Sequence, residues 1–149
     1  MSVEFSSVEF ASVEFTVEDH PNPPRITDFE NCLMLVRPLR VMPWRHPDGN
    51  VTDAVRADVV VLDDEESPPE TLRGLTVIQS GLVRALKRRL GCAPPGTPVT
   101  TLARLSRIPS KRNPQHLVWV FEKPTEDDVA LARDYLDEVG DPFAPASAA

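Results

Sequence analysis

The segment SGLVRALKRRLG (Ser80–Gly91) interrupts a series of strand-like patterns with a different hydrophobic period. Its apolar residues recur at the spacing of one helix face: Leu82, Val83, Leu86 and Leu90. Gly91 is a natural stop, so the sequence predicts a helix over this segment. Arg84, Lys87 and Arg88 lie on the other faces. Basic residues in a last turn suit the helix dipole, and contact with a polyanion is the alternative explanation.

Three segments before this helix have the apolar patterns of β-strands. CLMLVRPLRVM (Cys32–Met42) is apolar with interspersed arginines and predicts a long strand that ends in the turn PWRHPDGN (Pro43–Asn50). AVRADVVVLD (Ala54–Asp63) alternates, with one face formed by Val55, Ala57, Val59 and Val61 and the other face carrying Arg56 and Asp58, so it predicts a second strand. TLRGLTVIQ (Thr71–Gln79) predicts a third strand, in which Gly74 marks a β-bulge.

Two more strands and a closing helix follow. VTTLARLSRI (Val99–Ile108) and HLVWVFEK (His116–Lys123) predict strands, joined by the basic loop PSKRNPQ (Pro109–Gln115). TEDDVALARDYLDEV (Thr125–Val139) predicts a helix, because Thr125 suits the N-cap, acids fill the first turn and apolar residues line one side.

The order of these elements predicts a mainly β protein with helices: three strands, a helix, two strands and an appended helix. This is the chain order of an OB-fold, a five-stranded β-barrel that binds oligonucleotides on the face of its second and third strands and with two of its loops. Other five-stranded barrels accept the same order. We assign residues 25–139, with the C-terminal helix, to this OB-fold-like domain.

The two ends of the chain differ from this domain. SVEF occurs three times near the start, at Ser2–Phe5, Ser7–Phe10 and Ser12–Phe15. A spacing of five collects the phenylalanines on no single face of a strand or helix, so we expect residues 1–24 to be a flexible acidic arm carrying copies of a short motif. A tandem duplication without function is the alternative. Residues 140–149 are expected to be a disordered tail.

Charge is divided unevenly along the chain. The net charge of −7 comes from residues 1–31 at −6, residues 32–124 at +5 and residues 125–149 at −6. A basic body between two acidic ends favours binding of a polyanion. The alternative is that the basic residues only solubilise a surface.

Several classes of protein are not indicated by this sequence. It has no run of 18 apolar residues and no basic start before an apolar run, so we expect neither a membrane span nor a signal peptide. Cys32 and Cys92 stand far apart, which favours a reduced, cytoplasmic setting. The motifs GxxxxGK[ST], GxSxG and HExxH are absent, and His20, His46 and His116 have no Cys or His at metal-ligand spacing. We therefore expect no enzyme, no metal and no other cofactor.

Two of these segments, DAVRADVVVLD (Asp53–Asp63) and TEDDVALARDYL (Thr125–Leu136), carry a resemblance to a known family. The chain resembles small proteins of actinobacterial phages assigned as OB-fold single-stranded DNA-binding proteins, over about residues 27–136. The triple SVEF and the proline-rich tail are not features of that family. The resemblance implies a role in DNA replication or recombination of a bacteriophage or prophage, in the host cytoplasm.

Sequence-tolerant binding of single strands uses cations for phosphates and aromatic rings for bases. The two tryptophans are the candidates for stacking: Trp44 stands in the first turn beside Arg45, and Trp119 lies in the last strand, where a core position is the alternative. The candidates for phosphate contact are the basic residues of strands and loops, each of which is otherwise a solvated surface charge: Arg37, Arg40, Arg45, Arg56, Arg73, Arg104, Arg107, Lys111 and Arg112.

Two kinds of function fit these features. The first is a single-stranded DNA-binding protein, with an RNA-binding module as a weaker variant. The second is an OB-like protein-interaction module whose acidic ends recruit replication or recombination proteins. DEVGDPFAPASAA (Asp137–Ala149) resembles the acidic, Pro-Phe tails with which bacterial single-strand binding proteins recruit partners, although six residues follow Phe143 here. The sequence is also compatible with a homo-oligomer.

Overall fold

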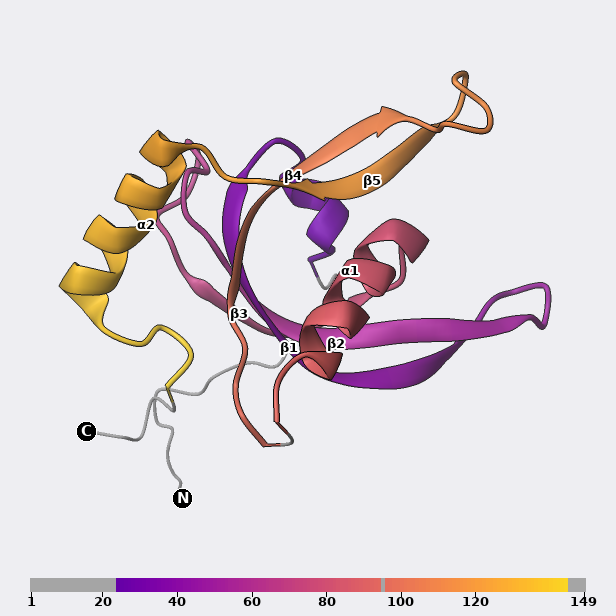
Figure 1. Ribbon diagram of the computed structural model, residues 1–149, viewed down its shortest axis with the longest axis horizontal. Helices are drawn as coiled ribbons and strands as arrows, with labels where there is room; N and C mark the ends of the chain where they lie inside the picture. Colours follow the sequence, from indigo (N-terminus) through magenta and orange to yellow (C-terminus); the bar gives the residue numbers. More distant parts are fainter. Residues whose placement is uncertain (1–23, 95, 145–149) are drawn as a thin grey trace, which may run out of the picture.

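The computed structural model describes residues 24–94 and 96–144 of the 149-residue chain. Five strands and two α-helices follow one another in the predicted order, after a short 3-10 helix, η3 (Figure 1). Their bounds are η3 Ile26–Phe29, β1 Leu33–Arg45, β2 Val51–Val61, β3 Thr71–Val77, α1 Ser80–Gly91, β4 Thr101–Pro109, β5 Leu117–Glu122 and α2 Glu126–Val139.

The five strands form one antiparallel sheet in the order β3-β2-β1-β4-β5. The prediction of a mainly β protein with five strands and helices is therefore confirmed. The predicted closed barrel is not, because no pairing joins β3 to β5 among the described strands and the sheet stays open.

Helix α1 packs against β5, one edge of the open sheet. It lies inside the curve of the sheet and contacts β5, β1 and β2 (Figure 1). A Cβ on Gly81 would stand 2.6 Å from the backbone oxygen of Trp119, so the first turn of α1 packs directly on the backbone of β5.

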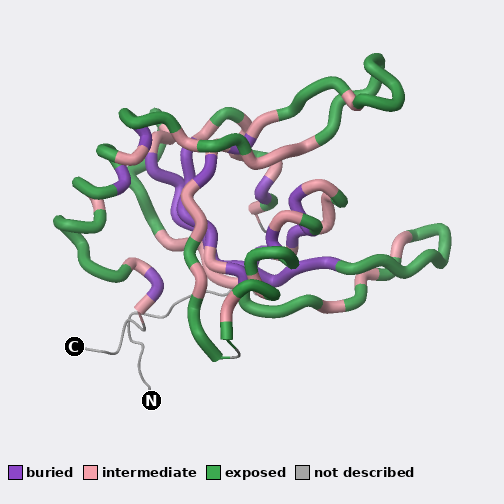
Figure 2. Tube along the Cα trace, in the orientation of Figure 1, coloured by how far each residue is buried: buried purple, intermediate pink, exposed green. Residues whose placement is uncertain are grey.

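The sheet is covered on both faces at its centre (Figure 2). The inner core joins alternate residues of β1, β2 and β3 to the apolar stripe of α1, with Val55, Leu75 and Leu86 among its members. The outer core joins the opposite faces of β1 and β2 to α2 through Leu35, Val60 and Ala132, and through the C-terminal Phe143. Two-sided burial explains why the strand centres read as nearly continuous apolar runs.

Two register shifts bend the sheet. One lies between Pro38 and Arg40 of β1. The other lies on the β2–β3 ladder at Gly74, whose φ of +71° is in the left-handed region and whose amide donates to Asp58 at 2.9 Å. The bulge predicted at Gly74 is confirmed, and bulges of this kind increase the local twist of a strand pair.

Arg104 fastens α2 to the outer face. Its guanidinium donates to Asp128 in the first turn of α2 at 2.6 Å, to Asp63 at 2.9 Å and to the backbone oxygen of Asn31 at 2.7 Å. Asp128 also caps α2 together with Thr125. The hydrogen bond from Arg104, followed by that from the backbone of Thr125, lowers the pKa of the Asp128 carboxyl.

The chain after α2 returns to the sheet. Phe143 is only 6% exposed, and the Arg37 guanidinium lies 4.6 Å from its ring centre. Arg73 donates to the backbone oxygens of Phe143 and Ala144, each at 2.9 Å. Residues 140–144, assigned from the sequence to a disordered tail, therefore pack on the outer face because an aromatic side chain and two arginines hold them there. The rest of that tail and the predicted flexible arm, apart from Pro24, lie outside the described residues.

We expect Gly81→Ala to lower the free energy of unfolding by about 1–3 kcal/mol, because the new methyl group overpacks against the β5 backbone. Gly91→Ala is the control, since a Cβ there meets nothing within 4 Å. Ala has a higher helix propensity than Gly, so the control is expected to keep or gain stability, by up to about 1 kcal/mol. Urea titrations followed by circular dichroism measure both changes, and equal losses would show that α1 does not press on β5.

We expect Asp128→Asn to make stability less dependent on pH in the acid range. The pKa of Asp128 is lower in the fold than in the unfolded chain, where it is about 4. The ionised carboxylate therefore stabilises the fold above about pH 4, and this contribution is lost as the pH falls through the lower pKa of the folded state. The measurement is the midpoint of urea unfolding between pH 7 and pH 3, and the difference between wild type and variant should shrink toward pH 3. A constant difference would contradict this linkage.

Candidate functional site

Two β-hairpin arms extend from the covered part of the sheet toward the same side of the molecule (Figure 1). The first arm is residues 40–55, at the far ends of β1 and β2, and the second arm is residues 106–120, at the far ends of β4 and β5. Helix α1 lies between them (Figure 1). Both arms are largely exposed, in contrast to the buried centre of the sheet (Figure 2).

Two hollows lie between α1 and the arms. One, of about 520 Å³, separates α1 from the first arm and is lined by His46, Thr52, Asp53, Ile78, Ser80, Val83, Arg84 and Lys87. The other, of about 650 Å³, separates α1 from the second arm and is lined by Ser80, Gly81, Arg84, Ile108, Pro109, Ser110, Lys111, Arg112, Val118, Trp119 and Val120. Ser80 and Arg84 line both. We call the two hollows together the inter-arm groove.

The amino end of α1 opens into this groove. Its N-cap, Gln79, makes no side-chain capping hydrogen bond, and its first turn holds no acid. The amino end of α2 is different, because Thr125 caps it and three acids fill its first turn. The first amides of a helix have no partner inside the helix and carry partial positive charge. The start of α1 therefore favours an anion.

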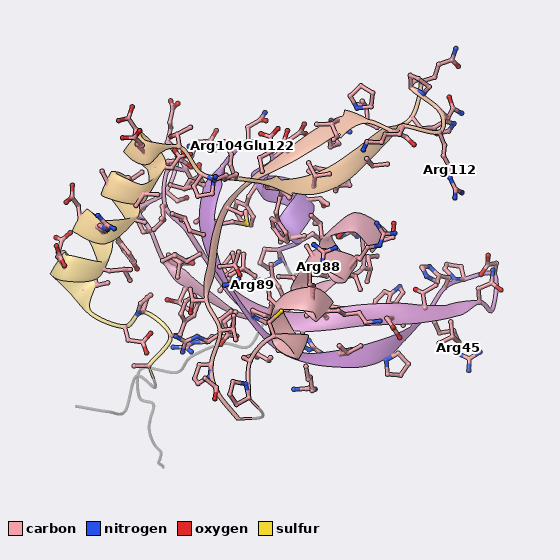
Figure 3. All side chains as sticks on the ribbon, viewed as in Figure 1. Arg45, Arg88, Arg89, Arg104, Arg112 and Glu122 are labelled. Carbon is pink, nitrogen blue, oxygen red and sulfur yellow. The ribbon has the colours of Figure 1, made fainter. Side chains whose placement is uncertain are left out.

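Three cations of the groove surround this helix end: Arg84 on α1, and Lys111 and Arg112 at the tip of the second arm. Among the described residues, no ion pair involves any of the three. Figure 3 shows Arg112 pointing from its arm toward the first arm. A fourth cation, Lys87, is paired with Asp53 at 2.6 Å, so the first-arm side of the groove is closer to neutral.

Trp119 is an aromatic residue among those that line the groove. It is partly buried against the inner core and also lines the groove. The Arg107 guanidinium lies 5.1 Å from its ring centre, and Arg107 is in turn paired with Glu30 at 3.0 Å, just after η3. Trp119 therefore packs on the inner core, the alternative weighed for it in the sequence, and it also belongs to the residues that line the groove.

Four of the predicted phosphate ligands lie on the outer face, away from the groove. Arg37 contacts Phe143 and is paired with Asp141, and Arg73 holds the backbone of the C-terminal segment. Arg104 binds Asp63 and Asp128, on the side of the molecule opposite the arms (Figure 3). Arg56 is only 8% exposed and donates to the backbone oxygen of Gly74 at 2.8 Å. These four arginines fasten the fold.

The remaining candidates lie on the first arm. Arg40 is exposed and stands opposite Arg56 in the β1–β2 ladder, on the face that becomes the outer face of the sheet. Arg45 is at the tip and points away from the second arm (Figure 3). Trp44 was expected in a turn, but β1 extends to Arg45 and places Trp44 in the strand, opposite the groove residue Thr52. Trp44 itself does not line the groove.

The sequence did not predict a binding site at Arg84, Ser80 or the amino end of α1. Arg84 was visible only as one of several basic residues on a helix. The one signal for the helix end is the sequence Gln79-Ser80-Gly81, which offers neither a capping acid nor an acidic first turn. The two arms lie on either side of the amino end of α1 because α1 packs against β5. A local sequence pattern does not show this packing.

Comparison with known proteins assigns no family or function to this chain. No protein-family model matches the chain, and no curated protein or solved structure is significantly similar to it. The resemblance to phage single-strand binding proteins therefore stays a prediction. Among residues 24–94 and 96–144, no three His, Cys, Asp or Glu side chains gather as a metal site. No helix in these ranges is long and apolar enough to cross a membrane.

Measurements of stability test whether an arginine holds the fold together or only lines the groove. We expect Arg104→Ala to cost about 2 kcal/mol of unfolding free energy or more, because it leaves the 7% exposed Asp128 without its partner. Arg84→Ala should change stability by less than about 0.5 kcal/mol, as is usual for exposed residues. Both are measured by urea unfolding at pH 7. Equal effects would contradict this distinction.

Proposed function

We propose that this protein binds single-stranded DNA in the inter-arm groove, with little dependence on base sequence. The observation that carries the proposal is that Arg84, Lys111, Arg112 and Trp119 line one hollow together with the uncapped start of α1. Cations and helix amides suit phosphates, and aromatic side chains suit unstacked bases. Duplex DNA hides its bases, so an aromatic contact favours a single strand.

The fold supports the same proposal. The strand order β3-β2-β1-β4-β5, with a helix between β3 and β4, is compatible with an OB-fold whose first and last edges have not closed. OB-folds are often partly open and contact oligonucleotides through the β1–β2 and β4–β5 connections. Here these two connections are the tips of the two arms. We therefore propose an open OB-like fold, acting in the DNA replication or recombination of a phage or prophage.

A protein-interaction module is the second candidate, and one observation favours it. Apolar side chains on both arms are between 38% and 54% exposed: Val41, Val51, Ile108, Leu117 and Val118. An apolar surface of this kind is typical of contacts with other proteins. Such contacts depend weakly on salt, whereas phosphate contacts depend on it strongly, which separates the two candidates.

We expect fluorescent oligo-dT to bind the protein at 50 mM salt and to lose affinity steeply at 200 mM. Each phosphate contact on a single strand adds about 0.7 to the slope of log affinity against log salt. Duplex of the same length should bind more weakly, and oligo-U serves to compare RNA with DNA. Equal affinity for duplex, or no binding of either at low salt, would overturn the proposal.

The double variant Lys111→Ala/Arg112→Ala should weaken binding of oligo-dT and reduce the salt slope by about 1.4, the sum for two lost phosphate contacts. The control is Lys123→Ala/Arg133→Ala, which removes the same two residue types from exposed positions at the α2 side of the molecule. Its slope should stay that of the wild type. If both doubles lower the slope equally, binding follows net charge and not the groove.

A further inference from the structure

The chain carries a segment whose chemistry matches the inter-arm groove. Residues 1–23 contain five acids and no Lys or Arg, and three of the acids belong to the SVEF repeats: Glu4, Glu9 and Glu14. Each repeat places a carboxylate next to a phenylalanine ring. A nucleotide presents the same pair of features, an anion next to a flat ring.

The groove offers the complementary features on the second arm. Lys111 and Arg112 are exposed there with Arg84 nearby on α1, and Ile108 and Val118 present apolar surface at 38% and 40% exposure. A carboxylate near these cations and a ring on the apolar strand surface would both be favourable, because opposite charges attract and apolar area leaves water.

The start of the described chain is joined to a wall of this groove. Pro24 precedes η3, and Glu30 directly after η3 is paired with Arg107, which lies over Trp119. The amide of Asn31 donates to the backbone of Leu105 in β4 at 2.7 Å. Eight residues lie between Phe15 and Pro24, so the nine steps of chain from one to the other reach at most about 30 Å. This reach is comparable with the diameter of a small domain.

Other surfaces near the start of the domain fit the repeats less well. The hollow that Pro24 itself lines also contains Asp28, Asp64 and Glu70, which would repel acidic repeats. The outer face of the sheet is covered by α2 and residues 141–144. Charge complementarity therefore selects the inter-arm groove.

We propose that the SVEF repeats are an internal ligand of the inter-arm groove, with Glu4, Glu9 and Glu14 facing its cations and Phe5, Phe10 and Phe15 on its apolar wall. The docking itself does not depend on any function of the groove. Its consequence, competition between the repeats and DNA, rests on the proposed function. The repeats then limit DNA binding, and a strand of sufficient length displaces them.

The magnitude of this competition follows from tethering. A short tether gives the repeats an effective concentration of about 1 mM, so repeats that bind with a dissociation constant of about 0.1–1 mM lower the affinity for DNA about two- to tenfold. Screening of the carboxylates by salt reduces the effect, because the Debye length is about 10 Å at 0.1 M.

The first experiment uses no DNA. Trp44→Phe leaves Trp119 as the only tryptophan, so emission reports on the groove. We compare the full chain with a version lacking residues 2–18, and add the peptide SVEFSSVEFASVEF to the shortened protein. The deletion should change the emission of Trp119, and the peptide should restore it. Unchanged emission in both cases would overturn the proposal whether or not the protein binds DNA.

Matched variants separate ring from charge. Phe5→Ser/Phe10→Ser/Phe15→Ser keeps the three carboxylates, and Glu4→Gln/Glu9→Gln/Glu14→Gln keeps the three rings. Both should shift the emission of Trp119 toward that of the deleted protein. Lys111→Ala/Arg112→Ala should weaken binding of the peptide to the shortened protein. If the Phe variant behaves like the parent, the rings make no contact and the proposed docking is wrong.

The last experiment measures competition with oligo-dT. Deleting residues 2–18 should raise affinity about two- to tenfold at 50 mM salt, with a smaller gain at 200 mM. Equal affinities of the full and shortened chains would overturn the competition. If neither chain binds oligo-dT, the proposed DNA-binding function fails, and the Trp119 emission still decides whether the repeats dock.

Discussion

The close contact between the first turn of α1 and the backbone of β5 is the constraint on which the rest of the molecule depends. It requires Gly81, because any side chain would meet the backbone oxygen of Trp119. With the helix in this position, β5 carries α1 along its edge, and the ends of two hairpins lie on either side of α1. The same packing contact places the start of α1 at the floor of the groove.

The outer face of the sheet is held by a separate set of contacts. Arg104 ties α2 to the sheet through Asp128 and Asp63, and Arg37 and Arg73 hold the segment that ends the described chain. These arginines occupy alternate positions on strands whose other face lies in the inner core. Period-two alternation therefore places the fastening arginines on the outer face, whereas the groove cations come from helix α1 and from the β4–β5 loop.

This division explains how much could be predicted from the sequence. The bounds of α1, the order of the elements and the bulge at Gly74 are local patterns, and the structure confirms them. The ends of the strands in the arms were harder to predict, because an exposed hairpin buries too few side chains to show a periodic pattern. The sequence therefore predicts a turn at Trp44, where the structure has a strand. Closure of the sheet and the hydrogen-bond partners of Arg56 and Arg104 could not be predicted. They depend on contacts between residues 18 to 73 positions apart in the chain, and a local sequence pattern does not show such contacts.

The structure shows which of the charges along the chain are paired and which are not. The acidic C-terminal part is largely structural where it meets the sheet, since Asp128 and Asp141 face Arg104 and Arg37 on the outer side. Three cations without an ion pair among the described residues, Arg84, Lys111 and Arg112, line the hollow at the uncapped start of α1. Concentrated cations at a helix amino end raise the local potential for any anion that enters. The acidic residues 1–23 belong to the same chain and are therefore always present at high local concentration. A groove that attracts anions must either exclude this segment or bind it.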